Sequence, residues 1–288
     1  MKRISPTGDL ALKKVLASDE NKDILAGLIE DFFEIKAEDI VIEKPYSIAI
    51  CKEFIEGKEI SKLRETLKDV AASFKTSDFV AEIQIERTQF FDERALYYPF
   101  ERYCKNYSNP GTMKIGPDGK PIRYSSLRPV CALNILGYDH YDDEDALRIL
   151  ELYDPVRKKG LNIKLVRIGF FELSKNTVGL TPNQKHWHNY FTTGEAGLEA
   201  PAYIQKASQV IDYINLSEEE RNMISTLERI EANEQATMAA AFEGALKKQA
   251  VEIARNLLKL DIKLQDISTA TGLDIATLEK LRSGQTGN

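Results

Sequence analysis

Two consecutive strand-like segments constrain the fold of this chain more than any other feature. Residues 79–86 alternate apolar and polar side chains, which is the period of a strand with one buried face. Residues 66–74 also have the composition of a strand, and Thr76-Ser77-Asp78 between the two segments is typical of a turn. We therefore expect a β-hairpin near the centre of the first two thirds of the chain.

Helical and strand patterns alternate around this hairpin. Apolar residues at helical spacing predict helices over 9–16 and 23–33 before it and an aromatic-rich helix over 91–107 after it. Short apolar runs predict further strands at 39–43, 46–50, 130–136 and 163–173. The charged stretch 52–62 and the acidic stretch 139–145 have the composition of exposed loops, and Thr181-Pro182 is a typical helix start. This order of elements indicates an α/β fold.

Composition and charge exclude several classes of protein. The chain has 288 residues, of which 43% are hydrophobic and 29% charged, and these are values of a globular protein. Its formal charge of -6 excludes a uniformly basic nucleic-acid coat, so any contact with nucleic acid requires a local basic patch. The candidate patch lies within 155–211 and comprises Arg157, Lys158, Lys159, Lys164 and Arg167.

The three cysteines indicate the cellular location of the protein. Cys51, Cys104 and Cys131 are odd in number, far apart and without a Cys-x-x-Cys pair, which argues against a disulfide framework and against a zinc ribbon. No window approaches the roughly 18 apolar residues of a membrane-spanning helix. We therefore expect a cytoplasmic protein with reduced thiols and no membrane association.

Asp69, Glu82 and Gln84 are the best candidates for chemistry. Side chains two residues apart on a strand share a face, so Glu82 and Gln84 lie together, with Ile83 and Ile85 turned to the core. If Asp69 lies opposite on the neighbouring strand, two carboxylates meet above the sheet. Two carboxylates suit a hard divalent cation such as Mg²⁺, Mn²⁺ or Ca²⁺, and such an ion promotes phosphodiester hydrolysis. Gln84 can orient a water molecule but supplies no positive charge.

The motifs also resemble a known family when taken in order. The run 63–69 ending in Asp69, then Glu82-Ile83-Gln84, then Arg94-Ala95-Leu96-Tyr97-Tyr98 resembles the recombination-promoting nuclease and putative transposase family of bacteria. That family belongs to the PD-(D/E)XK nuclease superfamily. Residues 9–16 are similar to its opening helix, and residues 252–273 are similar to its C-terminal tail.

The resemblance implies a restriction-endonuclease-like mixed-sheet core flanked by helices and a metal-dependent DNA endonuclease activity. Carried over by position, Asp69 and Glu82 become metal ligands, Gln84 takes the place of the superfamily lysine, and Asp9 is an accessory candidate. DNA would be the partner, and the basic residues 157–167 would hold its phosphate backbone.

The last quarter of the sequence predicts a separate helical region. We expect a nuclease-like domain over 1–215 and a helical C-terminal region over 216–288. Ser217 to Glu220 form a capping-box pattern, and residues 228–248 have the composition of a long, partly exposed helix. Residues 262–281 fit either a small helix-turn-helix or an αα-hairpin that packs on the body or on another subunit. An apolar patch follows the long helix and comprises Ile253, Leu257, Leu258 and Leu260. Self-association would bury this patch, so the sequence predicts a homo-oligomer. A dimer is expected because two-fold symmetry is the commonest closed symmetry.

Two alternative functions remain open from the sequence. The first is a nuclease fold without catalysis that binds DNA or another partner, because Gln84 stands where a lysine is usual. The second is an interaction protein whose long helix mediates oligomerisation and which has no nuclease activity.

Overall fold

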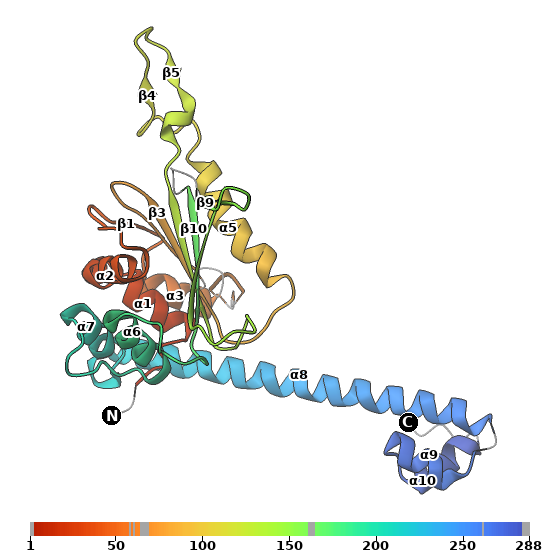
Figure 1. Ribbon diagram of the computed structural model, residues 1–288. Coiled ribbons are helices and arrows are strands. Elements are labelled where there is room, and N and C mark those ends of the chain that lie inside the picture. The colour runs from red at the N-terminus through yellow and green to blue at the C-terminus, as the bar shows by residue number, and fades with distance from the viewer. Residues whose placement is uncertain are drawn as a thin grey trace. The chain divides into compact units, whose positions relative to one another are not determined.

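The computed structural model describes residues 3–57, 59, 61–63, 69–160, 165–260 and 262–283, with the side chains of Asp69 and Glu231 excepted. It divides into two compact units, 1–221 and 222–288, which are described separately below (Figure 1). Among the described residues no helix is long and apolar enough to cross a membrane.

The first unit is built on a mixed six-stranded sheet with the order β1-β2-β3-β6-β10-β7. β3 runs parallel to β6 and β6 parallel to β10, and the remaining pairs are antiparallel. This is the α/β mixed-sheet class that the sequence predicts. The strands are β1 (Val41–Glu43), β2 (Asp69–Ser73), β3 (Asp78–Gln84), β6 (Val130–Leu136), β7 (Leu147–Glu151) and β10 (Val166–Glu172).

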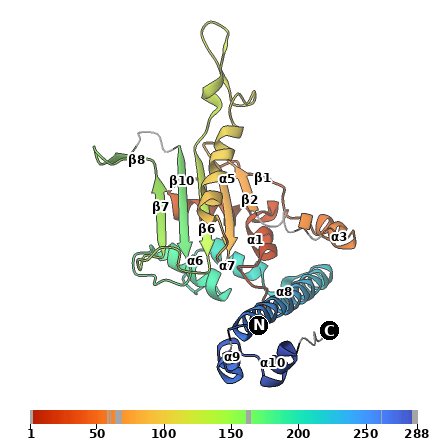
Figure 2. The same ribbon diagram turned by 90° about the vertical axis from the view of Figure 1, so that its right-hand side faces the viewer.

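Helices cover both faces of this sheet. One face packs against α5 (Phe91–Lys105), through a cluster that includes Phe91, Ala95, Ala132 and Phe170. The other face packs against helices that include α2 (Lys22–Phe33), with edge-on contacts such as that of Phe33 with Phe79. In Figure 2 the face covered by α5 is turned toward the viewer. The remaining helices of the unit are α1 (Asp9–Leu16), α2 (Lys22–Phe33), α3 (Ile48–Glu56), α6 (Pro182–Thr193) and α7 (Ala202–Val210).

One predicted strand is a helix. The segment expected as a strand at 46–50 contains the start of α3, and the charged stretch after it continues this helix to Glu56. Ser47 caps the helix, because its side chain accepts a hydrogen bond from the backbone N–H of Ile50. Serine is a strong N-cap residue, and that local preference outweighs the short apolar run that follows it.

Two small hairpins extend from the amino-terminal ends of neighbouring strands. The first, β4 (Lys114–Ile115) with β5 (Pro121–Ile122), precedes β6, and the second, β8 (Tyr153–Asp154) with β9 (Lys159–Gly160), precedes β10. Figure 1 and Figure 2 show the first hairpin projecting well past the end of the sheet. Because β6 and β10 are parallel neighbours, both hairpins belong to the same end of the sheet. Short 3-10 helices occupy Asp19–Asn21, Arg123–Ser126 and Tyr213–Asn215.

A single long helix, α8 (Glu218–Leu258), leads into the second unit. Its start has the predicted capping box, in which Glu220 N donates to Ser217 Oγ at 3.1 Å and Ser217 N donates to Glu220 Oε2 at 2.9 Å. Two short helices follow, α9 (Leu264–Thr271) and α10 (Ile275–Arg282). They form a small core with the end of α8 around Ala254, Ile267 and Leu278.

The apolar patch predicted just after the long helix is partly covered within the chain. Leu257 and Leu258 pack against the core that α9 and α10 form, while Ile253 and Leu260 stay exposed. Half of the patch therefore needs no second subunit. Only Ile253 and Leu260 of this patch remain available to a second subunit.

Candidate functional site

The carboxyl ends of three parallel strands form one edge of the sheet. Gln84 of β3 pairs with Leu136 of β6, and Leu136 pairs with Glu172 of β10. Polar residues gather at this edge because the strands end there and the loops that follow are open to solvent. In α/β folds, crevices at the carboxyl ends of parallel strands are the usual places for ligands.

The predicted hairpin brings two candidate residues together. β2 and β3 are antiparallel neighbours, and the register pairs Asp69 directly with Glu82. The β-carbons of directly paired residues in antiparallel strands lie about 5 Å apart. The side chain of Asp69 lies outside the described residues, so only its backbone position is established.

Glu82 is a buried carboxylate held by an arginine. Its side chain is 4% exposed, and its Oε1 accepts a hydrogen bond from Nη2 of Arg94 at 2.6 Å. On the other side of β3 the register pairs it with Asn134, a buried amide that donates to the carbonyl of Gly169 at 3.2 Å. A carboxylate in such surroundings needs a cation nearby, because burial disfavours the charged form.

Gln84 presents its amide oxygen to the same arginine. Its Oε1 accepts a hydrogen bond from Arg94 Nη2 at 2.8 Å, and its Nε2 donates to the backbone carbonyl of Glu86 at 2.9 Å. The second bond fixes which end of the amide faces Glu82. The sequence placed Ile83 and Ile85 in the core, but only Ile83 is buried, because β3 ends at Gln84.

Arg94 reaches these oxygens from the first turn of α5. The turn begins at Phe90, whose backbone has a left-handed φ of 59°, and the backbone N–H of Arg94 donates to the carbonyl of Phe90 at 3.1 Å. The sequence showed Arg94 only as part of a helical motif. Its contact with Glu82 depends on the path of the loop between β3 and α5, which no local pattern encodes.

Tyr138 and Arg87 complete the surroundings of this edge. The guanidinium of Arg87 lies over the ring of Tyr138, 5.5 Å from its centroid. Burial raises the pKa of the Tyr138 hydroxyl, against the opposing effect of the charges of Arg87 and Arg94. Tyr138 therefore carries its proton at neutral pH. It comes from the loop after β6, and nothing in the sequence singled it out.

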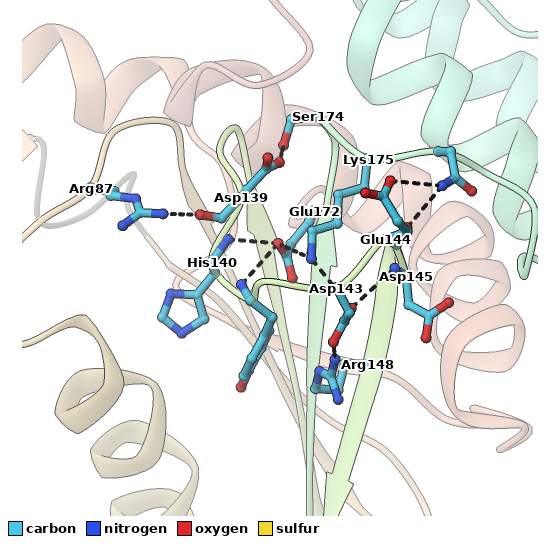
Figure 3. A network of polar contacts seen from close by, with 12 residues as sticks. Arg87, Asp139, His140, Asp143, Glu144, Asp145, Arg148, Glu172, Ser174 and Lys175 are labelled. Atoms are coloured by element: carbon cyan, nitrogen blue, oxygen red, sulfur yellow. Dashed lines mark hydrogen bonds and ion pairs between the residues drawn. The ribbon is translucent and has the colours of Figure 1, made fainter.

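The acidic loop after β6 has exposed carboxylates, as its composition predicts, and a polar network also ties it to the neighbouring loops (Figure 3). Glu172 is buried, and its Oε2 accepts from the backbone N–H of His140 at 2.7 Å and pairs with Lys175 Nζ at 2.9 Å. His140 Nε2 lies 2.8 Å from Asp92 Oδ1 on α5. Arg87 donates to the backbone carbonyl of Asp139. The network therefore connects the loop after β3, which follows Gln84, with the loops after β6 and β10.

The basic stretch expected to hold DNA lies at the opposite end of the sheet. Arg157, Lys158 and Lys159 belong to the β8–β9 hairpin before the amino end of β10, whereas Glu82 lies near the carboxyl end of β3. All three are exposed, and Arg157 pairs with Asp154 at 3.0 Å. Lys164 lies outside the described residues.

Arg167 does not belong to this surface. It is 8% exposed and pairs through Nε with Glu151 at 2.7 Å, and its Nη1 donates to the backbone carbonyl of Phe33. The alternation of β10 turns it toward α2, on the face opposite α5. Its charge is used to join the sheet to α2, so it is unavailable to a phosphate.

The oxygens at the carboxyl edge fit a hard cation. Glu82 Oε1 and Gln84 Oε1 both lie within hydrogen-bond distance of one nitrogen atom of Arg94, so they converge on one cationic position. Carboxylate and amide oxygens are typical ligands of Mg²⁺. Among the described side chains no group of three or more His, Cys, Asp or Glu residues could hold a metal alone. The side chain of Asp69 lies outside the described residues, so it could not count toward such a group. Asp9, the accessory candidate, is the first residue of α1.

Sequence comparison identifies the family. The chain belongs to the PD-(D/E)XK nuclease family transposases, whose family profile matches residues 6–241. No curated protein and no solved structure is significantly similar to it. Membership indicates a nuclease-type function acting on DNA, and PD-(D/E)XK nucleases generally use divalent metals.

Proposed function

We propose that this protein is a divalent-metal-dependent DNA endonuclease that hydrolyses phosphodiester bonds, with Asp69 and Glu82 as the metal ligands and Gln84 beside them. The observation that supports this most directly is the backbone pairing of Asp69 with Glu82 in a chain of the PD-(D/E)XK nuclease family. The convergence of the Glu82 and Gln84 side-chain oxygens on one position supports it further.

Each residue has a distinct task in this proposal. A bound divalent cation such as Mg²⁺, Mn²⁺ or Ca²⁺ would supply electrostatic stabilisation of the charge that develops on the phosphoryl oxygens. Glu82 and Asp69 hold that cation, and Gln84 orients a water molecule by hydrogen bonding. The water oxygen forms a bond to phosphorus, the bond from phosphorus to the leaving sugar oxygen breaks, and the proton of the water passes to solvent or to the leaving oxygen.

We assign binding of the DNA backbone to Arg157, Lys158 and Lys159 on the β8–β9 hairpin, with Lys164 following them. Their exposure and their charge support this role. Because the hairpin lies at the far end of the sheet from Glu82, these residues anchor the DNA at a distance and do not touch the phosphate that is cleaved. Cys51, Cys104 and Cys131, all of them described, form no disulfide with one another, which supports a cytoplasmic location.

The alternative is a nuclease fold that binds DNA or a partner without cleaving. Two observations favour it: Gln84 supplies no positive charge, and Arg94 already neutralises Glu82 without a metal. In that case Glu82 and Arg94 form a structural ion pair.

Cleavage of supercoiled plasmid and of single-stranded DNA, with Mg²⁺ or Mn²⁺ and with a chelator, separates the two functions. We expect metal-dependent nicking by the natural chain and its loss, by at least about 100-fold, in Glu82→Gln and Asp69→Asn. A control variant, Glu86→Gln, changes a nearby exposed carboxylate and should cleave normally. DNA binding without cleavage under any metal condition would favour the non-catalytic alternative. Cleavage retained in Glu82→Gln would show that the site lies elsewhere.

A further inference from the structure

Among the described residues, the guanidinium of Arg94 contacts both Glu82 and Gln84. One nitrogen, Nη2, serves both oxygens, at 2.6 Å and 2.8 Å. The Arg94 side chain is 26% exposed, so it lies at the boundary between the buried carboxylate and solvent. Its position is the one on which the two proposed metal-facing oxygens converge.

A divalent cation and this guanidinium would compete for the same oxygens. Both need a lone pair of Glu82 Oε1, and two positive charges so close together repel each other. Either cation would offset part of the desolvation of the buried carboxylate. Entry of a metal therefore requires Arg94 to withdraw, and the metal then takes over neutralisation of Glu82.

Once Arg94 withdraws from Glu82 and Gln84, its N–H donors are available for another acceptor. Guanidinium carries five N–H donors in a planar fork that matches phosphate oxygens. Here Nε is buried without a hydrogen-bond partner, and Nη1 makes one long contact of 3.5 Å with Thr88 Oγ1. The adjoining loop, residues 85–90, is exposed, which leaves room for the side chain to turn outward.

We propose that Arg94 is an internal counter-ion that holds Glu82 and Gln84 in place before metal binds, releases them when a divalent cation enters, and then contacts the DNA phosphate at the cleavage site. This proposal rests on the proposed endonuclease function. Arg94 then lowers the affinity for the metal, because it competes for the same oxygens. It also raises the cleavage rate, because it contacts the DNA phosphate.

Calorimetric titration of the full chain with Mn²⁺ alone tests the competition. Arg94→Gln should bind Mn²⁺ about tenfold more tightly than the natural chain, and Arg94→Lys should lie between them. Arg87→Gln is the matched control, because it removes a neighbouring guanidinium that contacts a backbone carbonyl and not Glu82. Its affinity should change less than about twofold. Cleavage by Arg94→Gln at saturating Mn²⁺ should fall about 100-fold, the usual effect of removing a donor to the developing charge.

The outcomes separate this proposal from the function on which it rests. If the natural chain binds Mn²⁺ and Arg94→Gln and Arg94→Lys bind it no more tightly, the competition is wrong while the metal site stands. An equal gain in Arg87→Gln would also overturn it, since only net charge would then matter. If neither the natural chain nor Arg94→Gln binds Mn²⁺, both proposals fail. Arg94→Lys retains the charge beside Glu82, so it keeps the test valid if the glutamine variant does not fold.

A separate observation concerns the surface of α8. Every residue from 232 to 249 is exposed, and three large apolar side chains lie among them: Met238 at 73%, Phe242 at 67% and Leu246 at 50%. At 100° per residue these three share one side of the helix. Most of the stability of a helix in a protein comes from packing of its apolar face, so this stripe favours a partner.

The residue types along this side of α8 are nearly symmetric about Phe242. Met238 and Leu246 stand four residues before and after it, Ala239 and Ala245 three residues, and Gln235 and Gln249 seven residues. Such symmetry is what a helix needs in order to pair with an antiparallel copy of itself, because each side chain then meets its counterpart across a two-fold axis at Phe242.

The charges along the same helix favour the antiparallel direction. Residues 228–243 contain four glutamates and one arginine, while residues 244–255 contain two lysines, one arginine and one glutamate. An antiparallel pair places the acidic half of one helix beside the basic half of the other. A parallel pair would place like charges together.

We infer that α8 associates with α8 of a second copy of this chain, antiparallel and centred on Phe242. Cysteine cross-linking in a Cys104→Ser background tests it, since Cys104 is the exposed native cysteine and Cys51 and Cys131 are buried. Phe242→Cys should cross-link to itself. Met238→Cys should cross-link to Leu246→Cys when the two are mixed and should not cross-link to itself. Phe242→Glu should convert the dimer to a monomer by light scattering, without unfolding, because the Phe242 side chain is 67% exposed.

Three results would overturn this inference. A monomeric mass for the natural chain at high concentration excludes self-association. Self-cross-linking of Met238→Cys without the mixed product indicates a parallel pair. A dimer that persists in Phe242→Glu and in Leu246→Glu places the interface elsewhere.

Discussion

Asp69 and Glu82 are paired residue to residue across the β2–β3 ladder, two positions before the carboxyl end of β3. If both hold one cation, their contributions are not independent. We expect Asp69→Asn and Glu82→Gln each to lower the cleavage rate by at least about 100-fold, and the double variant to be little worse than either one. Single-turnover cleavage rates measure this. Losses that multiply in the double variant would mean that the two carboxylates act separately.

Replacing the basic residues of the β8–β9 hairpin should weaken DNA binding without changing catalysis. In the triple variant Arg157→Gln, Lys158→Gln, Lys159→Gln, we expect affinity to fall and the dependence of affinity on salt to become shallower by about 0.9 per lost phosphate contact. The cleavage rate at saturating DNA should stay unchanged, because the hairpin is far from Glu82. Binding curves at several salt concentrations provide the measurement, and a matching triple change at exposed Lys36, Lys44 and Lys185 is the control. An unchanged salt dependence would remove the hairpin from the DNA-binding surface.

Asp31 should prove important for stability. Its Oδ2 accepts hydrogen bonds from Trp187 Nε1 and from Tyr203 Oη, both at 2.8 Å, and so joins α2 to α6 and α7. Trp187 is fully buried, so Asp31→Ala leaves its N–H without a partner. We expect a loss of about 3 kcal/mol in the free energy of unfolding, measured with urea. Asp23→Ala, an exposed change on the same helix, should cost well under 1 kcal/mol. Similar losses in both would mean that the Asp31 bonds add little.

Glu220 should make stability depend on pH in the acid range. Burial opposes its ionisation, yet hydrogen bonds from Lys14, from the Ser217 backbone and from Tyr46 hold its pKa below the ordinary value. A depressed carboxylate pKa gives stability that is complete above the unfolded-state value of about 4.3 and lost as pH falls through the lower folded value. We expect Glu220→Gln to cost about 2 kcal/mol at neutral pH.

Unfolding curves between pH 7 and pH 2 check the effect of Glu220. The stability difference between Glu220→Gln and the natural chain should shrink as the pH falls below about 4, because both chains then carry a neutral side chain at this position. Glu218→Gln, at an exposed position of the same helix, is the control. A difference that stays constant with pH would mean that shape rather than charge matters at Glu220.

The sequence by itself determined the elements whose signals are local. The alternation over 79–86, the turn at Thr76-Ser77-Asp78 and the helical spacing of 23–33 all correspond to the observed strands and helix. Thr181 and Ser217 also begin helices as their sequence patterns predict. These features need only neighbouring residues, because hydrogen bonds between residues three or four apart and side-chain alternation are short-range effects.

Pairing of Asp69 with Glu82 was also within reach of the sequence, because a short turn sets the register of a hairpin. Family resemblance supplied the order of the motifs, and the match over 6–241 confirms the family. The roles of Asp69, Glu82 and Gln84 remain proposals that the experiments above test.

Only the tertiary structure decided which distant residues meet. Arg94 reaches Glu82, Arg167 turns into the sheet–helix interface, and the basic hairpin lies at the far end of the sheet from the carboxylates. Composition marked Arg157 and Arg167 alike as basic, yet one is exposed and the other buried. The reason is physical: sequence patterns encode periodicity and local hydrogen bonds, whereas contacts between remote side chains depend on strand order and loop paths, which the packing of the whole unit sets.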